Sequence, residues 1–193
     1  LLETGKADFV VTYQPELVLA RAKGQKVQAI AALVQEPLTS LISLKPHGIT
    51  KASQLKGKTV GTAGLAYQAA YLDTILKAGG VDSSSVKRVD LGFNLTQPLI
   101  AKKVDASLGA FWNYEGVELQ RRKLNPVILR MEDIGVPTYD ELIFVARRQD
   151  LDAAGASRLR RFLSATAAGH RLLAANPQAG VDAAVGEQGV RPV

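Results

Sequence analysis

The chain has 193 residues, of which 47% are apolar and 22% are charged. This length suffices for one large domain or two smaller lobes with hydrophobic cores, and the composition excludes a wholly disordered chain. The absence of cysteine excludes disulfides, thiolate metal sites and cysteine nucleophiles. The net charge of +6 is spread along the chain without aromatic–basic interleaving, so we expect a solvated basic surface and no nucleic-acid partner.

The first residues do not have the pattern of a targeting segment. No apolar run approaches the length of a membrane span, and the first residues contain neither the charged nor the apolar region of a signal peptide. The chain opens at Leu1 without a methionine, and Gly5 follows as a residue that ends a helix. We therefore expect the sequence to begin inside a fold.

A β-α-β unit is expected first. Residues 7–11 are typical of a strand, residues 16–23 of a helix that Gly24 ends, and residues 27–34 of a second apolar strand. Such units imply parallel pairing of the strands, with the helix on one face of the sheet. The half-polar stretch 37–44 that follows is typical of a strand crossing between two lobes.

A glycine loop comes next, between a strand and a helix. Residues 59–64 are expected to form the strand and residues 67–77 the helix, with Gly64 in the loop and Tyr67 at the helix start. This geometry exposes backbone N–H groups to an acceptor on a ligand, although the alternative of an ordinary tight turn stays open. The loop lacks the Lys-Ser/Thr ending of a phosphate-binding loop, so nucleotide hydrolysis is not supported.

An aromatic and acidic cluster follows the strand expected at residues 104–108. It contains Phe111, Trp112, Asn113 and Glu115, just before a helix. In open α/β sheets ligands bind at this carboxyl end of a strand. One carboxylate beside flat rings suits a flat heterocycle that donates hydrogen bonds. The alternative is that the rings fill the core and the carboxylate only interacts with the helix dipole.

The second half of the chain repeats the sequence pattern of the first β-α-β unit. The two copies begin with Lys-apolar-Asp at residues 6–8 and 103–105, and they run to Val27 and Val127 with identical spacing from the helical leucine onward. We interpret this as an internal repeat, although α/β units share such patterns. A real repeat implies two similar lobes, each presenting a strand-end loop to the cleft between them; Tyr13 lies in the first of these loops.

The last third of the chain contains the second candidate crossover, at residues 131–139, and a buried strand at residues 141–147. Residues 151–174 have the pattern of an amphipathic helix. We interpret the acidic pair Asp140 and Glu141 as solvated or as capping a hinge, because no proton-transfer partner is identifiable.

The sequence nominates no catalytic centre. The two histidines, His47 in an expected loop and His170 in the amphipathic helix, lie on unrelated elements. A histidine metal site or a Ser-His-Asp triad would need carboxylate partners that the sequence does not supply. We therefore predict no catalytic residue, no metal and no cofactor.

Several of these segments are similar to the NMT1/THI5-like family, the substrate-binding proteins of ABC importers in the thiamine-pyrimidine group. The resemblance covers nearly the whole chain. The segments that carry it are residues 5–9, 13–16, 37–43, 57–61, 111–115 and 136–142. The Tyr-Gln-Pro-Glu element at residues 13–16 and the Trp-Asn-Tyr-Glu element at residues 112–115 are specific in combination.

The resemblance implies an α/β type II periplasmic-binding-protein fold, with two lobes, two crossover strands and closure over one ligand. We expect lobe I to comprise residues 1–42 and 138–193, and lobe II residues 43–137. Relatives carry further residues at the front, including a secretion signal and a first strand that lines the site. We therefore expect lobe I to lack its N-terminal part and its sheet to have an open edge.

The resemblance also implies roles for individual residues. In the family, the glutamate of the Trp-Asn-x-Glu element pairs with the aminopyrimidine and aromatic side chains sandwich the ring. By this resemblance Glu115 is the expected hydrogen-bond acceptor and Phe111 is expected to contact the ring. Relatives often have tyrosine where this chain has Phe111, which leaves the exact ligand open. The expected ligand-binding residues are Tyr13, Ser40, Gly64, Tyr67, Phe111, Trp112, Asn113, Glu115 and Tyr139.

By this resemblance we expect the extracytoplasmic, periplasmic solute-binding component of an ABC importer, a monomer that delivers an amino-heterocycle such as a thiamine pyrimidine precursor to a membrane permease. Riboflavin precursors, sulfonates and nitrate-like anions stay open as ligands, although Glu115 would repel an anion. The enzyme branch of the family makes the thiamine pyrimidine and resembles a single-turnover enzyme with a cysteine-rich motif and an active-site histidine. This chain has no cysteine, which disfavours that reading.

Overall fold

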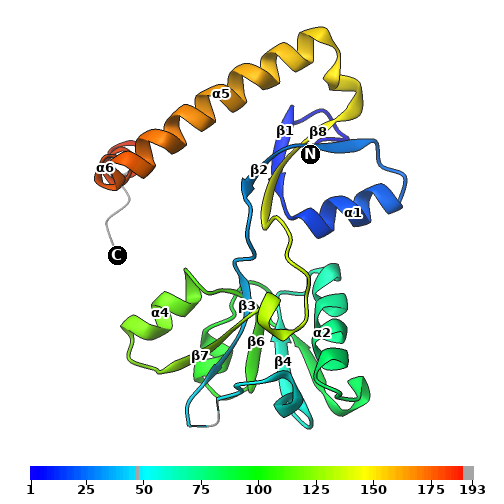
Figure 1. The fold of residues 1–193 in the computed structure, drawn as a ribbon, viewed down its shortest axis with the longest axis vertical. Helices are drawn as coiled ribbons and strands as arrows, with labels where there is room; N and C mark the ends of the chain where they lie inside the picture. Colours follow the sequence, from blue (N-terminus) through cyan, green and yellow to red (C-terminus); the bar gives the residue numbers. More distant parts are fainter. Residues whose placement is uncertain (47, 189–193) are drawn as a thin grey trace.

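The computed structural model describes residues 1–46 and 48–188, which form two β-sheets joined by two passages of chain (Figure 1). His47, expected in a loop, and the tail from residue 189 lie outside the described residues. We call the smaller sheet with its helix lobe I, and the larger sheet with its helices lobe II.

Lobe I is built on a three-stranded sheet with the order β1-β8-β2. Its elements are β1 (Phe9–Thr12), α1 (Gln14–Ala22), β2 (Val27–Val34) and β8 (Leu142–Arg147). β8 runs antiparallel to both neighbours, so β1 and β2 point the same way without pairing. The expected pairing within the first β-α-β unit is therefore wrong, because a strand from the far end of the chain lies between its two strands.

Lobe II is built on a five-stranded sheet with the order β5-β4-β6-β3-β7. Its strands are β3 (Thr39–Leu44), β4 (Thr59–Thr62), β5 (Lys87–Asp90), β6 (Ala106–Phe111) and β7 (Pro126–Arg130). Its helices are α2 (Ala66–Ala78), α3 (Gln97–Ile100) and α4 (Glu115–Arg121). β4 is parallel to β5 and β6, so the carboxyl ends of these three strands open at one edge of the sheet.

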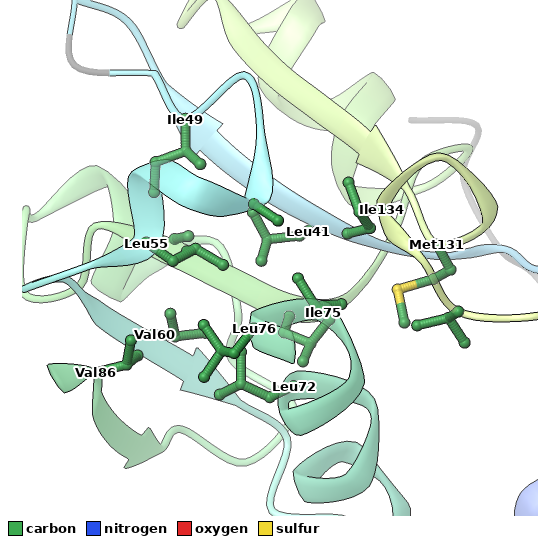
Figure 2. Packing of buried hydrophobic residues seen from close by; sticks show 14 residues of the cluster. Leu41, Ile49, Leu55, Val60, Leu72, Ile75, Leu76, Val86, Met131 and Ile134 are labelled. Carbon is green, nitrogen blue, oxygen red and sulfur yellow. The ribbon is translucent and has the colours of Figure 1, made fainter. Parts of the chain in front are cut away.

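The core of lobe II explains the position of α2. This helix buries Leu72, Ile75 and Leu76 on one face, where they pack with Val60 of β4 and Leu41 of β3 (Figure 2). The three-to-four spacing of the buried residues is that of an amphipathic helix. Packing along this face fixes the first turn of α2 at the sheet edge where β4 ends.

The passages between the lobes run through residues 35–38 and 135–141. β3 pairs with β6 and β7 from Thr39 onward, so it belongs entirely to lobe II. The first lobe boundary, expected after residue 42, therefore falls before Thr39. The half-polar pattern was misleading because Ser40 and Ser43 are fully buried and make hydrogen bonds inside lobe II.

The two lobes contain related β-α-β units. In the first unit, β8 lies between β1 and β2 and is antiparallel to both. In the second unit, β3 lies between β6 and β7 in the same way. A residue with positive φ follows each helix, Gly24 at 84° and Lys123 at 57°. By residue identity Lys23 corresponds to Lys123, whereas by backbone conformation Gly24 corresponds to Lys123. The expected repeat is therefore present, but its register at this point is one residue out.

After β8, the turn η4 (Arg148–Leu151) leads into α5 (Ala153–Ala175) and α6 (Pro177–Gln188). α5 packs on lobe I near its start, where the Phe162 ring lies 4.0 Å from that of Phe9, and then extends away from the sheets (Figure 1). Leu172 and Leu173 near its end are exposed. Within residues 1–46 and 48–188, no helix combines the length and apolar character that crossing a membrane requires.

Candidate functional site

A cavity of about 350 Å³ lies at the edge of lobe II where β5, β4 and β6 end. Its size is at the lower end of the range for small-molecule sites. Three strand-end loops of lobe II contribute to it, and Tyr13 reaches it from lobe I. The lining residues are Tyr13, Ala63, Leu65, Tyr67, Gln68, Phe93, Leu95, Gly109, Phe111, Asn113, Tyr114 and Glu115.

The cavity brings together five of the nine residues predicted from the sequence, namely Tyr13, Tyr67, Phe111, Asn113 and Glu115. Gly64 lies between two lining residues, Ala63 and Leu65, with a φ of 76°. A side chain at Gly64 would also collide with the Asp90 carboxylate, so this tight turn requires glycine.

Ser40 and Trp112 do not line the cavity. The Ser40 hydroxyl donates a hydrogen bond to the Ala110 carbonyl at 2.7 Å inside the sheet. The indole Nε1 of Trp112 donates to the Pro37 carbonyl at 3.2 Å, and the Arg130 guanidinium lies 4.4 Å from the centroid of the indole ring. Trp112 therefore holds the first passage against lobe II.

Tyr139 also lies at the hinge, beside a buried carboxylate. Its hydroxyl donates to Glu141 at 3.1 Å. The fully buried Glu141 carboxylate also accepts from the Leu38 N–H at 2.7 Å, the Thr39 N–H at 2.8 Å and the Thr39 hydroxyl at 3.0 Å. Glu141 thus links the two passages, and of the two interpretations of the acidic pair, the hinge role is confirmed for this residue.

A row of tyrosine rings leads from the cavity to the hinge. The ring centroids are 5.7 Å apart from Tyr13 to Tyr67, across the lobes, and 5.2 Å apart from Tyr67 to Tyr71 and from Tyr71 to Tyr139. Burial raises the pKa of all four phenols, to about 12 for Tyr71, and nearby carboxylates raise the pKa further. These hydroxyls therefore stay protonated at neutral pH.

Glu115 begins α4 at the cavity wall. Its Oε2 accepts a hydrogen bond from the Phe111 N–H at 2.6 Å, which anchors the half-buried side chain to the end of β6. No hydrogen bond from the described residues reaches Oε1. This oxygen leaves a charged acceptor for a ligand.

The electrostatic character of the lining comes from Glu115. Among the described lining residues it is the one charged side chain, and no Lys or Arg accompanies it. A cavity of this kind favours a neutral or cationic ligand over an anion. No group of three or more His, Asp or Glu side chains in the described part of the chain could hold a metal ion.

The sequence prediction missed seven lining residues, and those with polar or aromatic side chains are Gln68, Phe93 and Tyr114. Phe93 and Tyr114 are 76% and 72% exposed, and they follow β5 and β6 on either side of the β4 loop. Their position after expected strands was a usable signal. Gln68 was also recognisable as a polar residue on the apolar face of the helix, where its side chain is 2% exposed.

A larger hollow of about 570 Å³ lies in lobe I between β2 and α5. Its walls include Phe144, Leu163 and His170, and none of the predicted site residues reaches it. It lies along the carboxyl half of β2, and none of the lobe II strand-end loops contributes to it. The carboxylate of this hollow, Glu36, is exposed and faces Arg130, whereas Glu115 in the smaller cavity is half-buried and anchored to the end of β6. The smaller cavity is therefore the better candidate site.

The family model described as NMT1/THI5 like matches residues 1–180. The chain belongs to the NMT1/THI5-like family. This agrees with the resemblance of the individual segments, including the two that bring Tyr13, Phe111 and Glu115 to the cavity.

Two curated relatives illustrate the range of this family. The formylaminopyrimidine-binding protein of Halalkalibacterium halodurans is 29% identical over 177 residues, which are 92% of this chain and 53% of the relative. The 4-amino-5-hydroxymethyl-2-methylpyrimidine phosphate synthase of Legionella pneumophila is 35% identical over 130 residues, 67% of this chain and 40% of the relative. The chain spans about half the length of the curated relatives it matches.

Among solved structures, the periplasmic aliphatic sulphonate binding protein SsuA from Escherichia coli matches with a TM-score of 0.78 at 15% identity. The match covers 98% of this chain and 64% of that chain. This NMT1/THI5-like chain therefore has the type II periplasmic-binding-protein fold expected from its sequence. At such low identity the similarity concerns the fold and not the ligand.

Proposed function

We propose that this NMT1/THI5-like protein binds a small amino-heterocycle, such as a thiamine pyrimidine precursor, in the cavity lined by Tyr13 and Glu115. The observation that carries the proposal is the lining, which combines one carboxylate with the amides of Gln68 and Asn113 and several aromatic rings. A carboxylate oxygen accepts from an exocyclic amino group, and aromatic rings stack on a flat heterocycle. The name of the Halalkalibacterium relative supports this ligand class.

In this proposal the protein is the solute-binding component of an ABC importer and delivers its ligand to a membrane permease without catalysis. It acts outside the cytoplasm as a monomer. Support comes from the two-lobe architecture, in which the ligand site has contributions from both lobes and the lobes meet at the Glu141 hinge. The periplasmic SsuA structure has the same fold.

Anions such as sulfonates are less suitable ligands. A sulfonate needs cationic side chains or free N–H donors, and Glu115 would repel it. The glycine loop offers little compensation, because the Ala63 N–H already donates to Gln68 Oε1 at 2.8 Å and the Gly64 N–H to Thr62 Oγ1 at 3.3 Å. The fold similarity to SsuA alone does not favour this class.

The enzyme branch of the family is the other alternative, since one relative is a pyrimidine phosphate synthase. The resemblance attributes a cysteine-rich motif and an active-site histidine to that branch. This sequence has no cysteine, and His170 lines the lobe I hollow instead of the candidate site. We therefore propose binding without catalysis.

The exchange Glu115→Gln tests this function. It removes the charge but keeps an oxygen that can accept the Phe111 N–H, so the fold should be retained. We expect the affinity for 4-amino-5-hydroxymethyl-2-methylpyrimidine to fall at least about tenfold, because a hydrogen bond to a charged group contributes about 1.5–3 kcal/mol. Isothermal titration calorimetry measures the change.

Glu118→Gln is the matched control. Glu118 lies one turn later on α4 and pairs with Arg122 at 3.0 Å on the surface, so the exchange removes the same charge outside the cavity. Its affinity should stay within about twofold of the unmodified protein, since exposed pairs contribute little. Equal losses in both variants, or an unchanged affinity in Glu115→Gln, would contradict the proposal.

A further inference from the structure

The Gln68 amide is a cavity group whose hydrogen-bonding capacity is only half used. Gln68 is the third residue of α2, and its side chain is almost completely buried yet lines the cavity. Its Oε1 accepts a hydrogen bond from the Ala63 N–H at 2.8 Å. No hydrogen bond from Nε2 to another described residue is present.

The bond to Ala63 fixes the orientation of the amide. A backbone N–H can donate only to the oxygen of Gln68, because a flipped amide would place one donor against another. Nε2 must therefore point away from Ala63. The orientation follows from the hydrogen bond and does not depend on distinguishing oxygen from nitrogen directly.

Gly109 lies where Nε2 points. It has a φ of 108° and sits in a bulge of β6, where the pairing with β3 skips from Ala110 to Leu108. A Cβ at Gly109 would collide with Gln68 Nε2, which is the nearest atom to that position. Both residues line the cavity. The missing side chain thus provides the space through which the NH₂ group reaches the cavity wall.

We propose that Gln68 Nε2 donates a hydrogen bond to a ring nitrogen of the ligand while Glu115 Oε1 accepts from the adjacent amino group. This inference rests on the proposed function and specifies its ligand class. The ligand must carry a donor and an acceptor on neighbouring positions of one flat edge, as an aminopyrimidine does where the amino-bearing carbon adjoins a ring nitrogen. An aromatic amine that lacks this nitrogen leaves the buried NH₂ group unpaired.

A site built to form a hydrogen bond strongly rejects an analogue that cannot form it, because the buried group then loses its partner. The test therefore compares two ligands by calorimetry: 4-amino-5-hydroxymethyl-2-methylpyrimidine and its analogue with C–H in place of the ring nitrogen next to the amino-bearing carbon. Both ligands are titrated at several pH values below about 10, and the affinities of their neutral forms are compared. We expect the unmodified protein to prefer the pyrimidine at least about tenfold.

Two variants locate this preference. Gln68→Met removes the donor, and Gln68→Glu removes it while keeping an oxygen for the Ala63 N–H, so the second variant preserves the turn if the first does not fold. In both, the preference for the pyrimidine should fall to within about threefold. Gln120→Met, an exposed exchange on α4 outside the cavity, should leave the preference unchanged.

Each outcome of this experiment supports or overturns the role of Gln68. Equal affinity of the unmodified protein for the two ligands overturns the assignment of Gln68, whether or not the variants fold. The same preference in the Gln68 variants as in the unmodified protein also overturns it and leaves the proposed function intact. No binding of the pyrimidine by the unmodified protein overturns the proposed function together with this inference.

Discussion

The Glu141 carboxylate is fully buried and surrounded by donors from both passages between the lobes. A charge in this position is tolerated because backbone and hydroxyl donors replace the water it loses on folding. The donors include two backbone N–H groups, which no side-chain rearrangement can withdraw. Glu141 therefore fixes the relative position of the two passages.

The exchange Glu141→Met should destabilise the protein. Methionine has no oxygen acceptor, so the buried N–H groups of Leu38 and Thr39 would lose theirs. We expect a loss of about 2–4 kcal/mol, which lowers the midpoint of thermal unfolding by several degrees. Asp140→Asn is the control and should change the stability by less than about 0.5 kcal/mol, because the hydrogen bond from Asp140 to Gln14 uses the backbone N–H. A midpoint unchanged in Glu141→Met would refute the hinge role.

The site residues differ in how well their positions could be predicted from the sequence. Phe111 and Glu115 were predictable, because a strand end followed by a helix start is a local pattern. Trp112 and Tyr139 were not, because their partners at Pro37 and Glu141 depend on how the lobes are joined. The amide orientation of Gln68 depends on a bulge in another strand, which no local pattern shows.

At the scale of elements, the two β-α-β units differ in the residue that follows the helix. Gly24 adopts its positive φ without steric cost, whereas Lys123 adopts the same region with a Cβ. Both residues donate to a carbonyl in the last helical turn, at 2.9 Å in each case. The two positions are therefore structurally equivalent but energetically different.

This difference predicts opposite effects at equivalent positions. Gly24→Ala should destabilise the protein by about 1 kcal/mol, while Lys123→Gly should leave the stability unchanged or raise it by up to about 1 kcal/mol. Urea unfolding of the two variants measures both changes. Destabilisation of similar size in both would show that the units do not correspond as the backbone indicates.

The elements themselves were largely predictable, but their partners were not. Periodicity located α1, β2 and α2 within a few residues. It could not show that β8 separates β1 from β2, because pairing depends on contacts between distant parts of the chain. For the same reason the predicted lobe boundary was misplaced at β3. The hydroxyl groups of this strand form hydrogen bonds with partners in β6 and in a nearby loop, which its own sequence does not show.

At the scale of the whole molecule, the tyrosine row connects the cavity to the hinge and makes stability sensitive to high pH. Burial raises the pKa of Tyr71 from 10.0 to about 12. Because the folded state holds this proton more tightly than the unfolded state does, the shift contributes stability that is fully present below pH 10. This contribution is lost as the pH rises from 10 through 12. We expect the urea midpoint to fall over this range, and to fall less in Tyr71→Phe. Identical slopes in the two proteins would contradict this assignment.

The order of strands in lobe I also determines when its sheet can form. Among the described strands, β1 and β2 pair only with β8, so this sheet cannot assemble until residue 147 has left the ribosome. The lobe II sheet uses one continuous segment from Thr39 to Arg130 and is complete earlier. β1 and β2 therefore emerge before the strands of lobe II but complete their sheet after them, and their edges stay unpaired until β8 is made.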